Sequence, residues 1–149
     1  MSKTYELAKA FKRKYPKTIA WRLKSHSKVI DRHLNKDEEV LYVFMGQKNN
    51  SSIDFVNTNL VVLTNKRVMI ATKRLLFGYF FTVITPDLFN DLSISQGLIW
   101  GRVNIDTVEE EVLLSNIDPK ALPEIETNVS NFMIKENKKE KTMKKRAKK

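Results

Sequence analysis

The 149-residue chain contains no cysteine, and it has no hydrophobic run long enough to cross a membrane. Without cysteine, disulfides, thiolate metal sites and thiol catalysis are excluded. A spanning helix needs roughly 18–20 consecutive apolar residues, and the most apolar stretch, residues 75–84, is shorter and contains Gly78 and Thr82. Residues 1–6 also lack the apolar segment of a signal peptide. These absences predict a soluble, cytoplasmic protein.

Catalytic signals are equally scarce. The sequence contains no glycine-rich phosphate loop, no nucleophile elbow and no carboxylate pair in an apolar setting. Its two histidines, His26 and His33, are seven positions apart with no third ligand at metal-binding spacing. The acidic run at residues 109–111 is explained by a solvated strand face. We therefore expect no enzymatic activity, no metal and no cofactor.

The charge that is present is unevenly distributed. The net charge of +10 divides into +8 over residues 1–37, −5 over residues 38–134 and +7 over residues 135–149. A mildly acidic centre with two cationic ends is typical of attraction to an anionic surface, whether lipid, nucleic acid or an acidic protein. Solubility alone explains the same pattern equally well.

Residues 60–72 carry the clearest structural signal. Two runs rich in branched apolar side chains, residues 60–63 and 68–71, flank a short polar link at residues 64–67. Branched side chains suit a pleated, half-buried strand, and Asn65 tolerates the positive φ that a tight reversal requires. The pattern predicts an antiparallel hairpin.

Similar short runs follow along the chain and predict about seven strands at 8–12-residue spacing, the pattern of a small sandwich or barrel. An apolar share of 42% is sufficient for a core without disulfides. The expected class is mainly β with flanking helices. Outside the hairpin, the predicted strands cover residues 39–45, 79–85, 91–95, 98–105 and 108–114.

Two helices are expected before the strands. At residues 3–15 an apolar stripe recurs at helical spacing. Pro16 ends this helix and is suited to open the next, in which Ile19, Leu23, His26 and Ile30 share one face. This second segment is either one helix or two shorter ones. The stripe of the first helix consists of Thr4, Leu7, Ala8, Phe11 and Tyr15.

A last helix is expected to begin at Asp118, as N-cap, and Pro119, although Pro123 can move its start to about residue 123. The chain then divides into a basic helical extension (residues 1–36), a β-rich domain (37–134) and a Lys-rich tail (135–149). The tail cannot bury a face, so we expect disorder or a frayed helical extension.

Seven strands closed by a C-terminal helix is the plan of a pleckstrin-homology (PH) fold. The segment Leu63-Thr64-Asn65-Lys66-Arg67-Val68, with residues 97–105 and 114–117, resembles the YokE-like group of bacterial PH domains over roughly residues 37–134. The resemblance implies a PH-like seven-stranded antiparallel half-barrel, no known enzymatic activity and mostly undefined ligands. Fold likeness alone does not supply a function.

Phosphoinositide binding, which a PH fold suggests, requires several cations on the first two strands and their loop. Residues 39–54 offer only Lys48, so no specific phosphoinositide site is expected. At residues 72–78, Lys73 and Arg74 precede bulky apolar residues that include Phe77. This segment is either a tip that inserts into a membrane interface or a plug for the barrel mouth.

A second candidate contact lies in the N-terminal extension. Projecting residues 17–32 as one helix places Trp21 opposite the apolar face, among cations. Such a cluster suits an anionic membrane or stacking on an unpaired base; alternatively, Trp21 docks on the β-domain or on a partner subunit. The cations of this predicted face are Lys17, Lys24, Lys28 and Arg32.

The predicted function is a non-enzymatic binding module that associates with an anionic membrane surface, a protein partner or both, peripherally at the inner face of the membrane. One alternative is a protein-interaction or homo-oligomerising module in which the N-terminal helices pack on a neighbouring subunit and the tail is passive. A weaker alternative is non-specific nucleic-acid binding. Specific nucleic-acid recognition is not expected, because eight of the nine basic tail residues are lysine.

Overall fold

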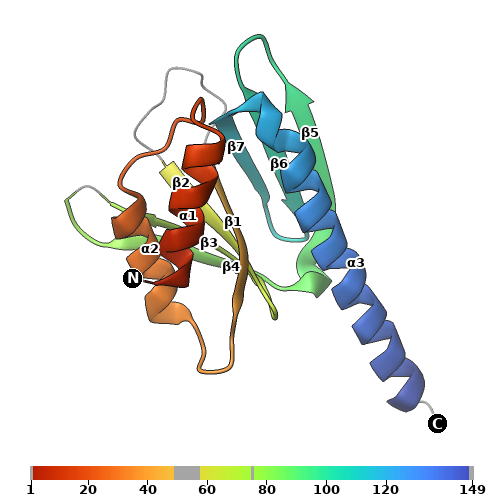
Figure 1. Cartoon of the computed structure of the whole chain (residues 1–149). Helices are drawn as coiled ribbons and strands as arrows, with labels where there is room; N and C mark the ends of the chain where they lie inside the picture. Colours follow the sequence, from red (N-terminus) through yellow and green to blue (C-terminus); the bar gives the residue numbers. More distant parts are fainter. Residues whose placement is uncertain (1, 49–57, 75, 148–149) are drawn as a thin grey trace.

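Seven antiparallel strands form an open, strongly curved sheet with helices before and after it (Figure 1). The computed structural model describes residues 2–48, 58–74 and 76–147. The strand order β4-β3-β2-β1-β7-β6-β5 leaves β4 and β5 as the two edges of the sheet. The elements are α1 (Lys3–Lys14), α2 (Leu23–His33), β1 (Val40–Gln47), β2 (Thr58–Thr64), β3 (Val68–Lys73), β4 (Tyr79–Ile84), the 3₁₀ turn η1 (Pro86–Leu88), β5 (Phe89–Gln96), β6 (Gly101–Thr107), β7 (Glu111–Ile117), the 3₁₀ turn η2 (Pro119–Ala121) and α3 (Leu122–Ala147).

This architecture confirms the predicted seven-stranded half-barrel with a C-terminal helix. The predicted hairpin is confirmed as β2–β3, with Leu63 opposite Val68 and Leu60 opposite Ala71. The last two strands begin three residues later than predicted, because residues 98–100 and 108–110 form connections rather than strand.

Strands β1–β4 and β5–β7 meet at a narrow seam. The register pairs β1 with β7 only at Gln47 and Ser115. The backbones approach closely here, since a Cβ on Gly46 would lie 2.9 Å from the Ser115 carbonyl oxygen. Glycine is therefore needed at position 46 for this contact.

The core fills the space enclosed by the two groups of strands and by α3. Buried apolar side chains come from every strand group and from the first turns of α3, which explains why the runs at 60–63 and 68–71 are apolar on both faces. Burial of one such side chain contributes about 1.5–3 kcal/mol. Among those that are fully buried are Phe44, Met45, Leu60, Met69, Ile105, Leu114 and Ile125.

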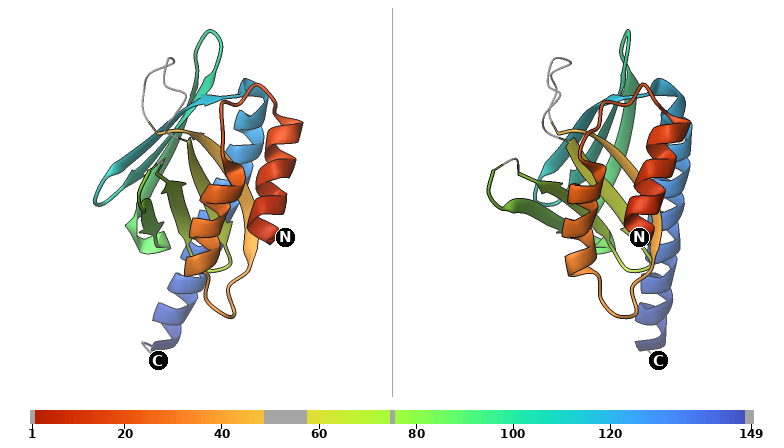
Figure 2. Two further views of the ribbon diagram at one scale, coloured as in Figure 1. Left: turned by 90° about the vertical axis from the view of Figure 1, so that its left-hand side faces the viewer. Right: turned by 60° about the vertical axis from the view of Figure 1, so that its left-hand side comes forward.

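Helices α1 and α2 lie side by side over the first group of strands, with α1 against β1 and α2 against β3 (Figures 1 and 2). The predicted stripe of α1 is largely confirmed, because Thr4, Ala8, Phe11 and Tyr15 are buried. The N-terminal segment thus packs on the β-domain and does not stand free.

The prediction that a helix begins at Pro16 is wrong: α2 begins at Leu23. The backbone before it is extended and bonds to the sheet, as the Ile19 N–H donates to the Asn116 carbonyl (2.9 Å) and the Trp21 N–H to Thr58 Oγ1 (3.1 Å). These tertiary bonds replace the first helical turns, and Arg22 enters the helix with a φ of 55°.

The C-terminal segment is one helix. Asp118 caps η2, accepting a bond from the Lys120 N–H (3.1 Å), and α3 follows directly at Leu122. Of the two alternatives for the tail, the structure has the helical extension, which runs to Ala147 and projects away from the body (Figure 1).

Candidate functional site

The connections of the sheet fall at two opposite ends. Gln47, the last residue of β1, pairs with both Thr58 and Ser115, and Gly101, the first residue of β6, pairs with Ile117. The β1–β2 and β5–β6 connections therefore lie at one end of the sheet. The β3–β4 connection lies at the same end, because consecutive hairpin connections alternate between the two ends. We call this the loop end (described residues 15–22, 47–48, 72–74, 76–80, 96–102 and 115–121). The turn end consists of residues 35–39, 64–67, 85–88 and 107–111.

The α1–α2 linker, residues 15–22, joins the loop end together. Besides its bonds to Asn116 and Thr58, it accepts a bond from the Trp100 indole Nε1 at the Lys17 carbonyl (3.1 Å). Arg22 donates to the Lys73 carbonyl (2.9 Å) and to the Arg74 carbonyl (3.4 Å) at the base of the β3–β4 hairpin. The linker therefore fixes three separate loops relative to one another.

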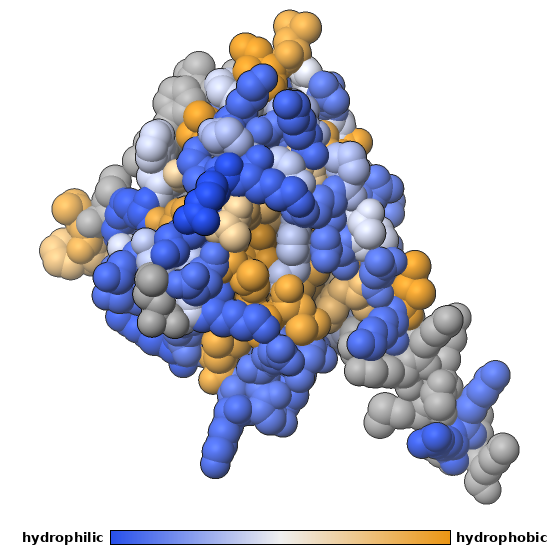
Figure 3. Space-filling model, viewed as in Figure 1, coloured by the Kyte–Doolittle hydropathy of each residue, from blue (hydrophilic) through white to orange (hydrophobic). Residues whose placement is uncertain are grey.

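Two apolar tips project from the connections of this end, the β5–β6 tip at the top of Figure 3 and the β3–β4 tip at its left edge. In the β3–β4 connection, Leu76 and Phe77 are 84% and 82% exposed. In the β5–β6 connection, Leu98 is fully exposed and Ile99 largely so. Phe77 is therefore not a plug for the barrel mouth, and Leu75, the other residue of that alternative, lies outside the described residues. Exposed apolar groups of this kind indicate a contact surface.

Cations accompany these apolar groups. The Arg74 guanidinium lies 5.3 Å from the Phe80 ring centroid, and the cation over the exposed Trp21 is Lys12, with its Nζ 5.7 Å from the ring centroid. The sequence did not indicate Lys12, because the helix projection on which its neighbours were predicted is wrong. Lys12 Nζ also donates to the carbonyls of Pro16 and Thr18, and burial lowers its pKa.

The predicted cation face around Trp21 is not a single face. Lys17 lies in the extended linker, whereas Lys24 and Lys28 are exposed on α2 beside α1. Arg32 is farther along α2, where its guanidinium lies 6.0 Å from the Tyr79 ring centroid. The structure thus leaves Lys17 and Trp21 in the linker, has Lys24 and Lys28 on α2 beside α1, and brings Arg32 next to Tyr79 at the start of β4.

Charge differs sharply between the two ends. Among the described residues, the loop end carries seven Lys or Arg and one acidic residue, whereas the turn end carries three Lys or Arg and seven acidic residues. The single loop-end acid, Asp118, is buried. An anionic surface would therefore attract the loop end and repel the turn end. The loop-end cations are Lys17, Arg22, Lys48, Lys73, Arg74, Arg102 and Lys120.

His26 supports the base of the β3–β4 tip. Its Nδ1 accepts the Lys73 N–H at 2.7 Å, and the ring is almost completely buried. Burial, with a smaller contribution from the Arg22 charge, lowers the pKa of His26 to about 4. The ring is neutral at neutral pH, as an acceptor at this position requires.

His33 also has a structural environment. Its ring stacks on Phe81 with 3.8 Å between centroids, and its Nδ1 lies 2.8 Å from the Val29 carbonyl oxygen. In the part of the chain that the structure describes, no three His, Cys, Asp or Glu side chains gather into a group able to hold a metal ion.

At the turn end, the Leu63–Val68 motif forms a structural latch. Arg67 makes a two-pronged ion pair with buried Glu38 (Nε–Oε2 2.9 Å, Nη2–Oε1 3.0 Å), to which Thr64 Oγ1 also donates (2.6 Å). Burial alone would raise the pKa of the Glu38 carboxyl, but these bonds outweigh it and lower the pKa below its usual value.

Asn65 does not have the predicted positive φ, since the non-glycine residues with positive φ in the described chain are Arg22 and Asn116. Instead, Asn65 shapes the reversal through hydrogen bonds: its Oδ1 accepts the Glu39 N–H (2.8 Å), and its own N–H donates to the Glu39 carbonyl (3.0 Å). The motif therefore holds the β2–β3 turn against the α2–β1 connection.

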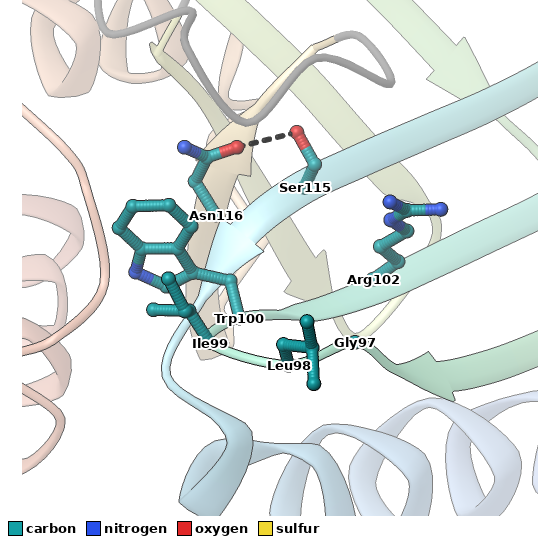
Figure 4. Close-up of a pocket in the computed structure, with 7 residues that line it drawn as sticks. All are labelled: Gly97, Leu98, Ile99, Trp100, Arg102, Ser115 and Asn116. Carbon is teal, nitrogen blue, oxygen red and sulfur yellow. Dashed lines mark hydrogen bonds between the residues drawn. The ribbon is translucent and has the colours of Figure 1, made fainter.

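A pocket of about 220 Å³ opens beside the β5–β6 tip, at the seam between the two groups of strands (Figure 4). Trp100 forms one wall and Arg102 stands on the opposite side, while Ser115 and Asn116 lie at its inner end. It is lined by Gly97, Leu98, Ile99, Trp100, Arg102, Ser115 and Asn116.

The family model for bacterial PH domains matches residues 34–131, about two thirds of the chain. The chain belongs to the bacterial PH domain family. Membership indicates a binding module, and the residues matched are those of the β-domain with the first turns of α3. Comparisons with curated proteins and with solved structures gave no match.

In this PH domain, α1 and α2 lie before the matched region, so the linker that organises the loop end is an addition to the family's β-domain. Within the described residues, no helix is long and apolar enough to cross a membrane.

Proposed function

We propose that this PH domain is a non-enzymatic module that binds an anionic membrane surface through its loop end. The observation that carries the proposal is the pairing of two exposed apolar tips, Leu76–Phe77 and Leu98–Ile99, with an excess of cations at the same end of the barrel. Apolar side chains that enter the interface beside cations at the headgroups are the features of peripheral membrane binding.

The expected energies are sufficient for reversible attachment. Full burial of a Leu or Phe side chain contributes about 1.5–3 kcal/mol, and each cation near an anionic leaflet contributes about 1 kcal/mol. Because the tips are small and carried by loops, the binding should be peripheral and dependent on anionic lipid.

The proposal changes the contact residues that the sequence suggested. Lys17, Trp21, Lys73, Arg74 and Phe77 remain in the contact, because they lie at the loop end. Lys24 and Lys28 are left outside it, since they lie on α2 beside α1, and Arg32 lies at its margin, next to Tyr79 at the start of β4.

A protein-interaction or homo-oligomerising function stays the alternative, but not in the form first expected. Helices α1 and α2 already bury their apolar stripes on the chain's own sheet, so they have no free stripe for a neighbouring subunit. A protein partner would instead use the loop-end tips. Assignment to the YokE-like group remains a prediction based on the Leu63–Val68 segment.

Flotation with phosphatidylglycerol-containing and with purely phosphatidylcholine vesicles tests the proposal. We expect the wild-type chain to float with the anionic vesicles, and the pair Leu76→Asp/Phe77→Asp to reduce binding at least tenfold because charges replace both inserting groups. Val108→Asp is the matched control, since Val108 is 65% exposed but lies at the turn end.

Equal binding to both vesicle types at low salt would refute the proposal, as would equal losses for the loop-end pair and the Val108 control. Light scattering in the absence of lipid addresses the alternative: a concentration-dependent dimer that the loop-end pair abolishes would favour protein association.

A further inference from the structure

We infer that the pocket at the seam binds the phosphodiester group of a single anionic phospholipid, with the lipid chains leaving past Leu98 and Ile99. This inference rests on the proposed membrane function and names a headgroup subsite within the same surface. The pocket adjoins the β5–β6 tip, because residues 97–100 of that connection line it together with Arg102 of β6 and with Ser115 and Asn116 of β7 (Figure 4).

A β-bulge builds the inner part of the pocket. Gly101 pairs with Ile117 and Val103 pairs with Leu114, so the single residue Arg102 faces the two residues Ser115 and Asn116. Asn116 adopts a left-handed conformation with a φ of 59°. A bulge re-aims side chains and often occurs beside a binding site, and a non-glycine residue held at positive φ is a strain that accumulates at ligand sites.

Hydrogen bonds to neighbouring segments hold the polar groups of the bulge in place. Ser115 Oγ lies 2.8 Å from Asn116 Oδ1 and 3.4 Å from the Gln47 carbonyl, and Ile19 of the linker bonds to the Asn116 carbonyl. Both side chains are buried. The inner end of the pocket is therefore polar and preorganised, unlike a gap between mobile surface side chains.

Arg102 supplies the charge. It is exposed and has no hydrogen bond or ion pair within the described residues, whereas Arg22 and Arg67 are hydrogen-bonded and Arg32 and Arg74 lie over aromatic rings. A guanidinium matches the two oxygens of a phosphodiester in a forked arrangement. One arginine in the pocket suits one negative charge, and this favours a simple phosphodiester over a headgroup with several phosphates.

The remaining walls suit the rest of an amphiphile. Trp100 has its Nε1 bonded to the Lys17 carbonyl, so its indole is fixed and presents an apolar wall to the pocket. Leu98 and Ile99 extend from the same hairpin toward the proposed membrane side. A headgroup next to Arg102 thus has its glycerol against the indole and its chains beside the apolar tip.

Fluorescence titration of the full chain with short-chain phosphatidylglycerol, below the concentration at which it forms micelles, tests the inference. The chain has two tryptophans, so Trp21→Phe leaves Trp100 as the single reporter in the pocket wall. We expect a saturable change in Trp100 emission, at least tenfold weaker binding with Arg102→Ala, and partial recovery with Arg102→Lys.

Lys36→Ala is the charge-matched control, because Lys36 is an exposed cation at the turn end; its affinity should stay within twofold of the parent. Circular dichroism melting of each variant establishes that it is folded. Unchanged affinity of folded Arg102→Ala, or an equal loss with Lys36→Ala, would overturn the inference.

Inorganic phosphate and glycerol phosphate form the second arm. Much weaker binding of both supports a lipid site, whereas saturation at the same concentration as the lipid would show a free-phosphate site and overturn the lipid assignment. Failure of short-chain lipid to bind while vesicle flotation persists removes the pocket inference alone. If the pair Leu76→Asp/Phe77→Asp leaves flotation unchanged and short-chain lipid still binds in the pocket, the proposed tip contact is refuted and the pocket inference stands.

Discussion

The two ends of the barrel use similar residues for different purposes. At the turn end, Arg67 is paired with a buried carboxylate and Lys66 lies 2.8 Å from Asp37, so these two cations form ion pairs within the domain. At the loop end, the seven cations face one buried acid, and apolar side chains stand exposed beside them. Two of the three turn-end cations are thus paired with turn-end acids, whereas the loop end leaves charge and apolar surface available for a partner.

This difference shows that a recognisable motif and a functional surface need not coincide. The Leu63–Val68 segment, which carries the family resemblance, stabilises the domain at the turn end. The candidate surface lies on short loops at the opposite end, where few residues form a signature. Substitutions at the turn end should therefore change stability, and substitutions at the loop end should change binding.

The largest stability effect is expected for Arg67→Ala. Its loss leaves the Glu38 side chain, which is completely buried, without its charged partner, and breaking a buried pair typically costs about 3–5 kcal/mol. Lys66→Ala removes only a solvent-exposed pair and should cost less than about 1 kcal/mol. Urea unfolding measures both; equal losses would contradict the latch.

The next effect concerns pH. The pKa of His26 is about 4 in the folded state against 6.5 for an ordinary histidine, so the unfolded chain binds the proton more readily. Stability is fully present above pH 6.5 and falls as the pH is lowered toward 4. Between pH 6.5 and 5 the loss should be at most about 2 kcal/mol.

Unfolding of wild type and His26→Asn across this pH range isolates the histidine. The asparagine side chain can still accept the Lys73 N–H but does not titrate, so the variant should have a flatter pH dependence. Parallel curves would show that His26 is not the titrating group.

A smaller stability effect is expected at the seam. Gly46→Ala places a Cβ 2.9 Å from the Ser115 carbonyl oxygen, which is backbone and cannot easily move, so we expect a loss of about 2 kcal/mol. Gly101→Ala brings a Cβ within 2.7 Å of Leu122, a side chain that can change rotamer. Thermal unfolding should therefore rank Gly46→Ala as the more destabilising; the reverse order would mean that the seam can open.

The smallest effect is expected for removal of the tail. Helix α3 begins at the loop end and has 26 residues, so at 1.5 Å per residue its end lies about 39 Å from its start. Charges that far from a docked membrane lie well beyond the Debye length of about 8 Å at physiological salt. Deleting residues 136–149 should change vesicle binding less than threefold, and a tenfold loss would mean that the tail itself reaches the lipid.

Much of the fold could be predicted because its signals are local. Branched runs on both sides of residues 64–67 predicted the β2–β3 hairpin, and helical spacing predicted α1. The start of α2 could not be predicted, since the residues after Pro16 have an acceptable helical pattern. Only the acceptors that Asn116 and Thr58 provide make the extended linker preferable.

The candidate surface was predicted in part. Lys73, Arg74 and Phe77 were identified from their order along the chain, but Trp21 was placed on a helix that does not exist there. Leu98 and Ile99 were assigned to the same strand as Arg102, but that strand begins at Gly101, and no sequence pattern distinguishes an exposed hairpin tip from a strand end. The pocket depends on a bulge, which adds one unpaired residue to a strand. The alternation of apolar and polar residues along the sequence does not reveal such an insertion.

The order of residues by itself determined the strand count, the absence of thiol chemistry, the cationic ends and the family likeness, because each depends on composition or on neighbours in the chain. The tertiary structure decided which charges are paired and which loops share an end. Those properties arise when strands distant in sequence are brought together, as Gln47 and Ser115 are at the seam. Hydrogen bonds between such segments then outweigh the local preferences of the residues that make them.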